Sequence, residues 1–83
     1  MVLVYVLQSK SKSRRYVGIT NDLNRRLQEH RSEKSTVHRL LGDFDLLLTE
    51  EYPDHKSART REKFLKSGKG REYLNKFIGR DTP

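Results

Sequence analysis

The first part of the chain alternates apolar residues in the way that is typical of β-strands. Residues 2–8 are mostly apolar, with valines alternating with leucine and tyrosine, and this predicts a central strand covered on both faces. The small polar residues 9–13 separate it from a second apolar run at residues 16–19. The two runs together predict a β-hairpin.

This hairpin would bring two tyrosines together. If the loop is centred on Lys10 and Ser11, Tyr5 lies directly across from Tyr16, with their Cβ atoms about 5 Å apart. The two hydroxyl groups could then share one site. A slip of one residue in the loop would send the tyrosines to opposite faces of the sheet, so the expectation depends on the assumed register.

Helical spacing follows the hairpin. Leu23 and Leu27 repeat four residues apart and predict a helix to about His30. Its first turn would be capped by the side chain of Thr20 or Asn21. The leucines face the core, which leaves the opposite side of this helix strongly basic.

A third strand is predicted at residues 44–50, after a polar loop with one short helical turn at residues 37–41. Strict alternation divides its apolar side chains between two faces. One face carries Phe44, Leu46 and Leu48, and the other carries Leu47.

Two more helices complete the pattern. The first would begin at Asp54 as its N-cap, run to about Ser67 and stop at the glycines of residues 68–70. The second is predicted from Arg71 to Ile78 and would bury Leu74, Phe77 and Ile78, with Asn75 on the flank of that stripe.

One position does not fit the core pattern. Ala58, Glu62 and Leu65 fall on the inner side of the helix that begins after Asp54, so an acid occupies a place where an apolar residue is expected. Glu62 is therefore expected to face inward, although a surface ion pair with Lys66, four residues later, would also account for it.

Composition limits the possible functions. Eighty-three residues are enough for a single domain, residues 1–83. The absence of cysteine and the three scattered histidines leave no disulfide framework and no Cys/His zinc pattern. No apolar run approaches the roughly 20 residues that span a bilayer, so a cytoplasmic protein without a membrane partner is expected. A net charge of +7 favours a polyanionic partner such as nucleic acid.

Five motifs are spread over about residues 2 to 78: Val4-Tyr5-Val6-Leu7, Tyr16-Val17-Gly18-Ile19-Thr20-Asn21, Leu23 to His30, Arg61-Glu62-Lys63 and Leu65 to Glu72. In order and spacing they resemble the GIY-YIG nuclease superfamily, in particular its small stand-alone branch related to the nuclease module of the bacterial excision-repair machinery. The resemblance implies an α/β sandwich, in which helices flank a three-stranded antiparallel sheet.

The resemblance also implies hydrolysis of a DNA phosphodiester with one bound divalent metal, Mg²⁺ or Mn²⁺. Tyr5 and Tyr16 correspond to the two signature tyrosines, one a general base and the other orienting the phosphate. Tyr5 is favoured as the base, with the exchanged assignment left open. Arg26 matches the catalytic arginine, and His30 lies one helical turn further on, either in a proton-transfer or phosphate role or simply solvated.

Glu62 matches the family's metal-binding acid, and a single carboxylate is chemically sufficient because Mg²⁺ keeps several water ligands. Asn75 matches a polar residue that contacts phosphate or supports the site. Further phosphate contacts are expected from Arg14, Arg25 and Lys69, although the segment around Lys69 also fits a plain helix stop.

The sequence thus predicts a metal-dependent DNA endonuclease, guided by DNA structure or only weakly by base sequence, in repair or recombination. Branched, flap and single-stranded DNA are all compatible, and no residue visibly reads a 2′-hydroxyl that would separate DNA from RNA. One alternative is a basic nucleic-acid-binding module of the same fold without catalysis. Another is an interaction protein that docks an acidic or repair partner, and the oligomeric state is left open.

Overall fold

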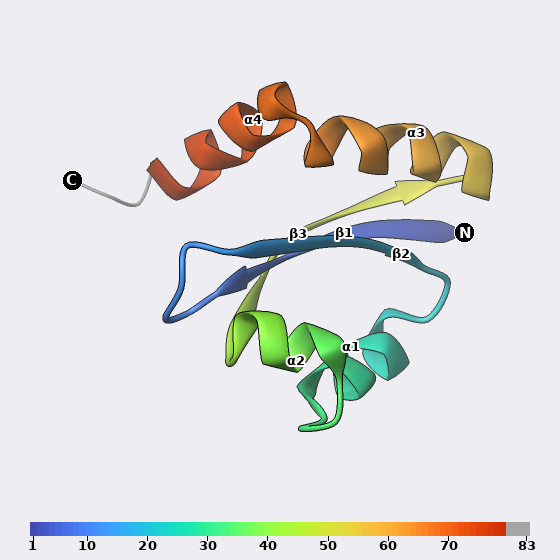
Figure 1. Cartoon of the computed structure of the whole chain (residues 1–83). Coiled ribbons are helices and arrows are strands. Elements are labelled where there is room, and N and C mark those ends of the chain that lie inside the picture. Colours follow the sequence, from blue (N-terminus) through green and yellow to red (C-terminus); the bar gives the residue numbers. More distant parts are fainter. Residues whose placement is uncertain (80–83) are drawn as a thin grey trace.

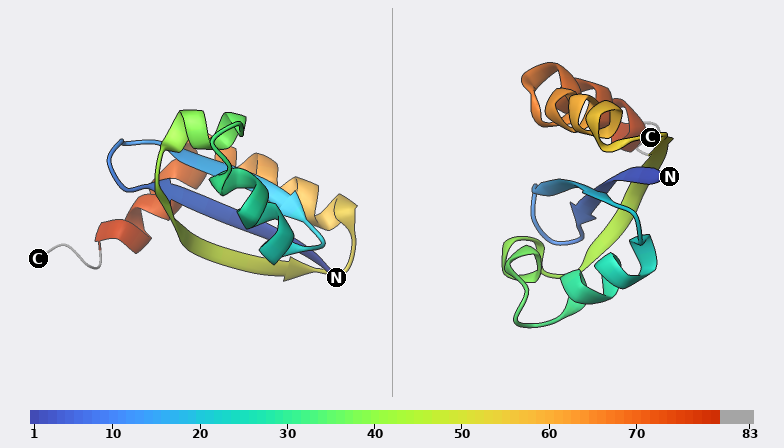
Figure 2. Two further views of the ribbon diagram at one scale, coloured as in Figure 1. Left: turned by 90° about the horizontal axis from the view of Figure 1, so that it is seen from below. Right: turned by 90° about the vertical axis from the view of Figure 1, so that its right-hand side faces the viewer.

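The computed structural model describes the backbone of residues 1–79 and the side chains of residues 1–76. Its strands and helices are β1 (Val2–Ser9), β2 (Arg15–Thr20), α1 (Leu23–Arg31), α2 (Thr36–Leu41), β3 (Phe44–Tyr52), α3 (His55–Lys66) and α4 (Gly68–Gly79). The strands form one antiparallel sheet in the order β2-β1-β3. Helices α3 and α4 cover one face and α1 and α2 the other (Figures 1 and 2). The predicted α/β sandwich is therefore confirmed.

The alternation in β1 divides the hydrophobic core in two, as expected for a strand covered on both faces. Val2, Val4 and Val6 pack with side chains of α3 and α4, chiefly Ala58, Leu65 and Leu74. Tyr5 and Leu7 face the other way and pack with side chains of α1, α2 and the start of β3, which are Leu27, Val37, Leu41 and Phe44. Tyr5 therefore lies in the layer between the sheet and α1.

The register of the hairpin differs from the predicted one. Tyr5 pairs with Gly18, and Tyr16 pairs with Leu7, so the two tyrosines are not directly opposite. The loop is longer than two residues because the hydroxyl of Ser9 accepts hydrogen bonds from the amides of Ser11 and Lys12. The shift is two residues, an even number, so both tyrosines still project from the same face.

A β-bulge in β3 also changes the predicted faces. Val6 pairs with Leu48 and Leu7 pairs with Leu46, which leaves Leu47 as an extra residue. Phe44 consequently packs on the α1 side, whereas Leu47 and Leu48 both pack on the α3 side. Leu46 is exposed. The prediction that Phe44, Leu46 and Leu48 share a face is wrong, because the bulge resets the alternation.

Of the two predicted helix caps, the one of α3 is confirmed and the one of α1 is not. Asp54 caps α3 as predicted, since its Oδ1 accepts the amide of Ser57 at 2.7 Å. For α1 the predicted cap is wrong. Asp22 serves instead, accepting the amide of Arg25 at 3.2 Å, while the hydroxyl of Thr20 accepts the amide of Asp22. The short helical turn near residues 37–41 is present as α2.

The glycines after α3 do not stop a helix. Helix α3 ends at Lys66 with the extended Ser67 as its C-cap, and α4 already begins at Gly68, because Gly70 allows the two helices to meet closely. A Cβ at position 70 would overlap the backbone of Phe64 and Leu65. The tight junction adds one turn to the start of α4, compared with the predicted start at Arg71.

Burial on α4 agrees with the prediction where side chains are described. Leu74 is almost fully buried, whereas the side chains of Phe77 and Ile78 lie outside the described residues. No helix within residues 1–79 is long and apolar enough to cross a membrane.

Candidate active site

The site is built at the β2 edge of the sheet, where a glycine lets a tyrosine reach across the edge strand. Tyr5 projects from β1 over Gly18 of β2, and a Cβ at position 18 would overlap the hydroxyl of Tyr5 and the ring of Tyr16. Glycine in a strand interior often marks such a close approach. Gly18 therefore sets the position of the Tyr5 hydroxyl.

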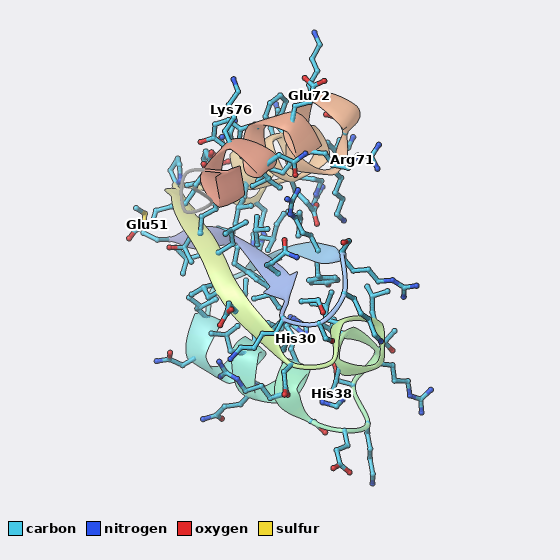
Figure 3. The ribbon with its side chains drawn as sticks, turned by 90° about the vertical axis from the view of Figure 1, so that its left-hand side faces the viewer. His30, His38, Glu51, Arg71, Glu72 and Lys76 are labelled. Atoms are coloured by element: carbon cyan, nitrogen blue, oxygen red, sulfur yellow. The ribbon has the colours of Figure 1, made fainter. Side chains whose placement is uncertain are left out.

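A buried hydrogen bond joins the sheet to α1 at this point. The hydroxyl of Tyr5 lies 2.7 Å from Nε2 of His30, and the two residues are 1% and 7% exposed. Figure 3 shows His30 on the side of the sheet covered by α1 and α2. The sequence left open whether His30 is a solvated helix residue, and its burial excludes that possibility.

Three aromatic rings gather around this bond. The ring of Tyr16 lies 6.2 Å from that of Tyr5 and 5.3 Å from the His30 ring, which it meets edge-on. Tyr16 is only half-buried, so it lies between the buried pair and solvent. The two tyrosines therefore share one site, as expected, although they are not cross-strand partners.

The electrostatics of the pair determine the charge state of each group. Burial, and then the neighbouring Tyr16, raise the pKa of Tyr5 above its ordinary value, and the opposing effect of Arg26 is smaller. Burial and Arg26 lower the pKa of His30. At neutral pH Tyr5 is therefore a phenol and His30 a neutral imidazole, and the Tyr5 hydroxyl donates to Nε2 in the tautomer that carries the ring proton on Nδ1.

Arg26 lies on α1 at the rim of the site. Its side chain is 46% exposed, and Nη1 lies 3.3 Å from Oε1 of Glu29. The more exposed Arg25 approaches the other oxygen of Glu29 at 3.8 Å. One acid is thus shared by two arginines, which leaves net positive charge at the rim.

Glu62 faces the site from α3, on the other side of the sheet edge. Its side chain is 21% exposed, and its carboxylate is near enough to Tyr5 to contribute to the raised pKa of that phenol. Ala58 and Leu65, which flank it on the helix, are buried. The inward position predicted for Glu62 is confirmed.

The ion pair between Glu62 and Lys66, which the sequence also allowed, is present as well. Nζ of Lys66 lies 3.1 Å from Oε2 of Glu62. No group of three or more acids, histidines or cysteines that could hold a metal exists within the described part of the chain. A lone carboxylate still suits one Mg²⁺ or Mn²⁺, which fills its shell with water and substrate oxygens, provided that Lys66 moves away.

An arginine that the sequence did not single out fixes the helix that carries Glu62. Arg61 makes two hydrogen bonds to Glu50 of β3, at 2.8 and 3.1 Å, and its guanidinium lies 4.9 Å from the Phe64 ring and 5.0 Å from the Tyr73 ring. Burial alone would raise the pKa of Glu50, but hydrogen bonds from Arg61 and Tyr52 lower it. This network joins β3, α3 and α4.

The other predicted contact residues are spread more widely. Asn75 accepts a 2.5 Å hydrogen bond from Nη2 of Arg15, so it supports another side chain. Arg14 is exposed at the end of the hairpin loop, and Arg25 lies on the opposite side of the sheet from α4. Lys69 is exposed in the first turn of α4. The structure places Arg14 and Asn75 in one groove that Tyr16 also lines, but Arg25 and Lys69 do not line it.

Two proton carriers, an arginine and an acid at one sheet edge are the groups that hydrolysis of a phosphate ester requires. The fold and this site define an α/β domain with a net positive charge and a cluster of ionisable side chains at one edge of its sheet. The family model described as the GIY-YIG catalytic domain matches residues 1–76, and the chain therefore belongs to the GIY-YIG family, a family of nucleases that generally use a divalent metal. No curated protein and no solved structure matches it significantly.

Sequence reasoning named Gly18 and Arg61 only as members of motifs, without a role for either, and missed the bond between Arg15 and Asn75. Only Gly18 left a signal, as a glycine inside a strand whose partner strand carries a large side chain. Arg61 and Arg15 act through contacts with residues 11 and 60 positions away. No local pattern marks such contacts.

Proposed function

We propose that this protein is a divalent-metal-dependent DNA endonuclease, guided by DNA structure and acting in repair or recombination. The observation that supports this best is the buried bond between Tyr5 and His30, with Tyr16, Arg26 and Glu62 around it. A buried tyrosine in a structural role needs a hydrogen-bond partner, but it needs no arginine and no acid around that bond. Its cytoplasmic location and its organisation as one domain over residues 1–83 stay predictions of the sequence.

The Tyr5–His30 pair suits the activation of water. Because its pKa is raised, Tyr5 is a poor phenolate, but its hydroxyl oxygen can accept a proton from water while its own proton passes to Nε2 of His30, 2.7 Å away. The neutral imidazole is available because burial lowers the pKa of His30. The two residues then act as one general base.

The remaining residues serve the phosphate. Tyr16, half-buried beside this pair, would donate its hydroxyl to a phosphate oxygen, and Arg26 would offer a planar fork to the charge that develops there. Glu62 would hold the divalent metal, which when bound neutralises the phosphate and stabilises the leaving oxygen. The burial of the two tyrosines distinguishes their roles. Tyr5, which is buried against His30, would act on water, and the half-buried Tyr16 would contact the phosphate.

The proposal is tested by cleavage of labelled duplex, flap, branched and single-stranded DNA at low salt with Mg²⁺, Mn²⁺ or EDTA. Glu62→Gln keeps the shape of the side chain but removes its charge, and is expected to lower cleavage by at least about 100-fold, in line with loss of a main electrostatic contribution. Glu72→Gln is the matched control, since Glu72 is exposed on α4 and points away from the sheet (Figure 3). Equal cleavage by both variants would contradict the site.

The ion pair at Glu62 gives a second prediction, which concerns metal binding alone. Lys66→Gln removes the cation that holds one oxygen of Glu62, so the affinity for Mn²⁺ without DNA should rise about two- to fivefold, the equivalent of an exposed ion pair. Calorimetry or the electron paramagnetic resonance of free Mn²⁺ measures this. Lys63→Gln, an exposed neighbour on α3, should leave the affinity unchanged, and an equal rise there would exclude specific competition by Lys66.

The alternative is a nucleic-acid-binding module without chemistry, which the net charge of +7 would support in the same way. It predicts salt-sensitive DNA binding with no dependence on metal and no product in any cleavage reaction. Binding unaffected by Glu62→Gln together with absent cleavage by the unmodified protein would favour it.

A further inference from the structure

A groove beside the candidate active site runs along the outer edge of β2. It has a volume of about 720 Å³ and lies between the hairpin loop, β2 and the helices α3 and α4, with one side chain from α2. Tyr16 lines it, so the groove opens onto the aromatic cluster. Clefts of roughly 300–1,000 Å³ hold ligands of small-molecule size, which corresponds to a few nucleotides.

The rim of the groove is cationic. Five basic residues line it, with no acid among the lining residues that the structure describes: Lys12, Arg14, Arg15, Lys66 and Arg71. They come from the hairpin loop, β2, α3 and α4, so the charge surrounds the groove. Figure 3 shows Arg71 on the β2 side of α4, whereas Glu72 and Lys76 on the same helix point away from the sheet. Such a rim is complementary to a polyanion.

Arg15 gives an independent indication that an anion belongs here. Its guanidinium is half-buried and makes hydrogen bonds to Gln8, at 2.7 Å from Nε, and to Asn75, at 2.5 Å from Nη2. Both acceptors are neutral amides, and no ion pair of Arg15 is found within residues 1–76. Burial lowers its pKa, but a guanidinium stays charged. A partly desolvated charge held by neutral groups is compensated when an anion binds beside it.

The floor of the groove indicates what kind of polyanion fits. Its base consists of Val17, Leu65 and Leu74, which are almost fully buried, and its accessible apolar surface comes from the half-buried Tyr16 and Leu40. A duplex would contact the groove only through its phosphates, because its bases stay stacked inside the double helix. Such a ligand would need the basic rim but no apolar surface. Unpaired bases expose apolar faces, and proteins that bind single strands combine a basic groove with apolar or aromatic surfaces.

We propose that this groove holds an unpaired strand of DNA, with its phosphates on the basic rim and its bases over the apolar floor, and leads it to Tyr16. The inference rests on the proposed function, since it supplies that function with its substrate class. The preferred substrates are then single strands, and flaps or branches with a single-stranded arm. Blunt duplex is disfavoured.

The test compares two double variants of equal charge. Arg14→Gln/Arg71→Gln removes two rim cations, and Lys34→Gln/Lys76→Gln removes two exposed cations that do not line the groove. Each lowers the net charge from +7 to +5. Affinity is measured by fluorescence anisotropy in EDTA, which prevents metal-dependent cleavage, with a labelled single-stranded oligonucleotide and a blunt hairpin duplex. Thermal unfolding followed by circular dichroism shows that both variants are folded.

The rim variant should lose roughly 10- to 30-fold in affinity for the single strand at 0.1 M salt, and its salt slope should fall by about 1.4, or about 0.7 for each lost phosphate contact. The control variant should lose less than about threefold, and both variants should bind duplex alike. Equal loss of single-strand affinity by both variants would overturn the proposal, as would an equal loss of duplex and single-strand affinity by the rim variant. Because no step depends on cleavage, an inactive protein that shows the predicted difference refutes the proposed function and leaves the groove proposal standing.

Discussion

Tyr5→Phe is expected to lower the rate of DNA cleavage by about 100- to 10,000-fold, the usual contribution of general base catalysis. The substitution removes one oxygen atom, which makes the hydrogen bond to Nε2 of His30, and keeps the ring that packs beside Leu7 and Leu27. His30→Gln should have an effect of similar size. Because the two residues act as one unit, the double variant should be no slower than about the worse single variant.

The pH profile separates this relay from a tyrosine that acts as a free phenolate. The relay needs neutral His30, whose pKa is lowered below its ordinary value of about 6.5. The rate should therefore be level at pH 7 and above, and it should fall only when the pH drops below about 6.5 and His30 takes up a proton. A phenolate base with the raised pKa of Tyr5 would give a rate that climbs steadily into the alkaline range. His55→Gln, exposed at the start of α3, is the control and should change neither rate nor profile.

Retention of more than about a tenth of the cleavage rate by Tyr5→Phe would exclude the relay. Folding must be checked first, since the variant leaves Nε2 of His30 buried without its partner, a loss of about 1–3 kcal/mol. For a domain of this size that corresponds to a decrease in Tm of at least several degrees. Rates are therefore compared at a temperature where circular dichroism shows both proteins folded.

Gly18→Ala is expected to combine a loss of stability with a loss of activity of about 100-fold. The added methyl group would overlap the hydroxyl of Tyr5 and the ring of Tyr16, so both side chains must shift. Overpacking of this kind costs about 1–3 kcal/mol, and a displacement of about 1 Å at a reacting group is enough for the loss in rate. Steady-state cleavage and thermal unfolding of the same sample measure both effects.

Gly68→Ala is the matched control for this substitution. No atom lies within 4 Å of the place that its Cβ would take, and its φ is not positive. Alanine loses less chain entropy than glycine on entering a helix, so the control should keep full activity and an unchanged or slightly higher Tm. Normal cleavage by Gly18→Ala would show that the catalytic position of the Tyr5 hydroxyl does not depend on the absence of a side chain at position 18.

Local sequence was enough to predict the elements and most of what faces inward. The alternation in β1, the i, i+4 leucines of α1 and the N-cap at Asp54 are properties of segments shorter than ten residues, and steric preferences within such segments decide them. The same reasoning placed Glu62 on the inner side of α3, because helical spacing alone puts it in line with Ala58 and Leu65. The structure confirms these elements and that position.

Register and long-range contacts were decided by the tertiary structure. The hairpin loop is long because the hydroxyl of Ser9 accepts two loop amides and donates to the carbonyl of Leu41, 32 residues away. The bulge at Leu47 depends on how β3 lies against β1. Neither follows from the residues of one segment, since each is the lowest-energy fit of two surfaces that the chain brings together only on folding.

The candidate site shows the same division. Sequence alone identified Tyr5, Tyr16, Arg26, His30 and Glu62 as candidates, because their residue types and spacing resemble a nuclease motif. It could not give the bond of Tyr5 to His30, which arises where β1 packs on α1, or the half-buried charge of Arg15 and the groove beside it, which arise where β2 packs on α4. The chemistry of each group follows from its residue type, whereas its protonation state and partners depend on burial and distance, which only the packed structure determines.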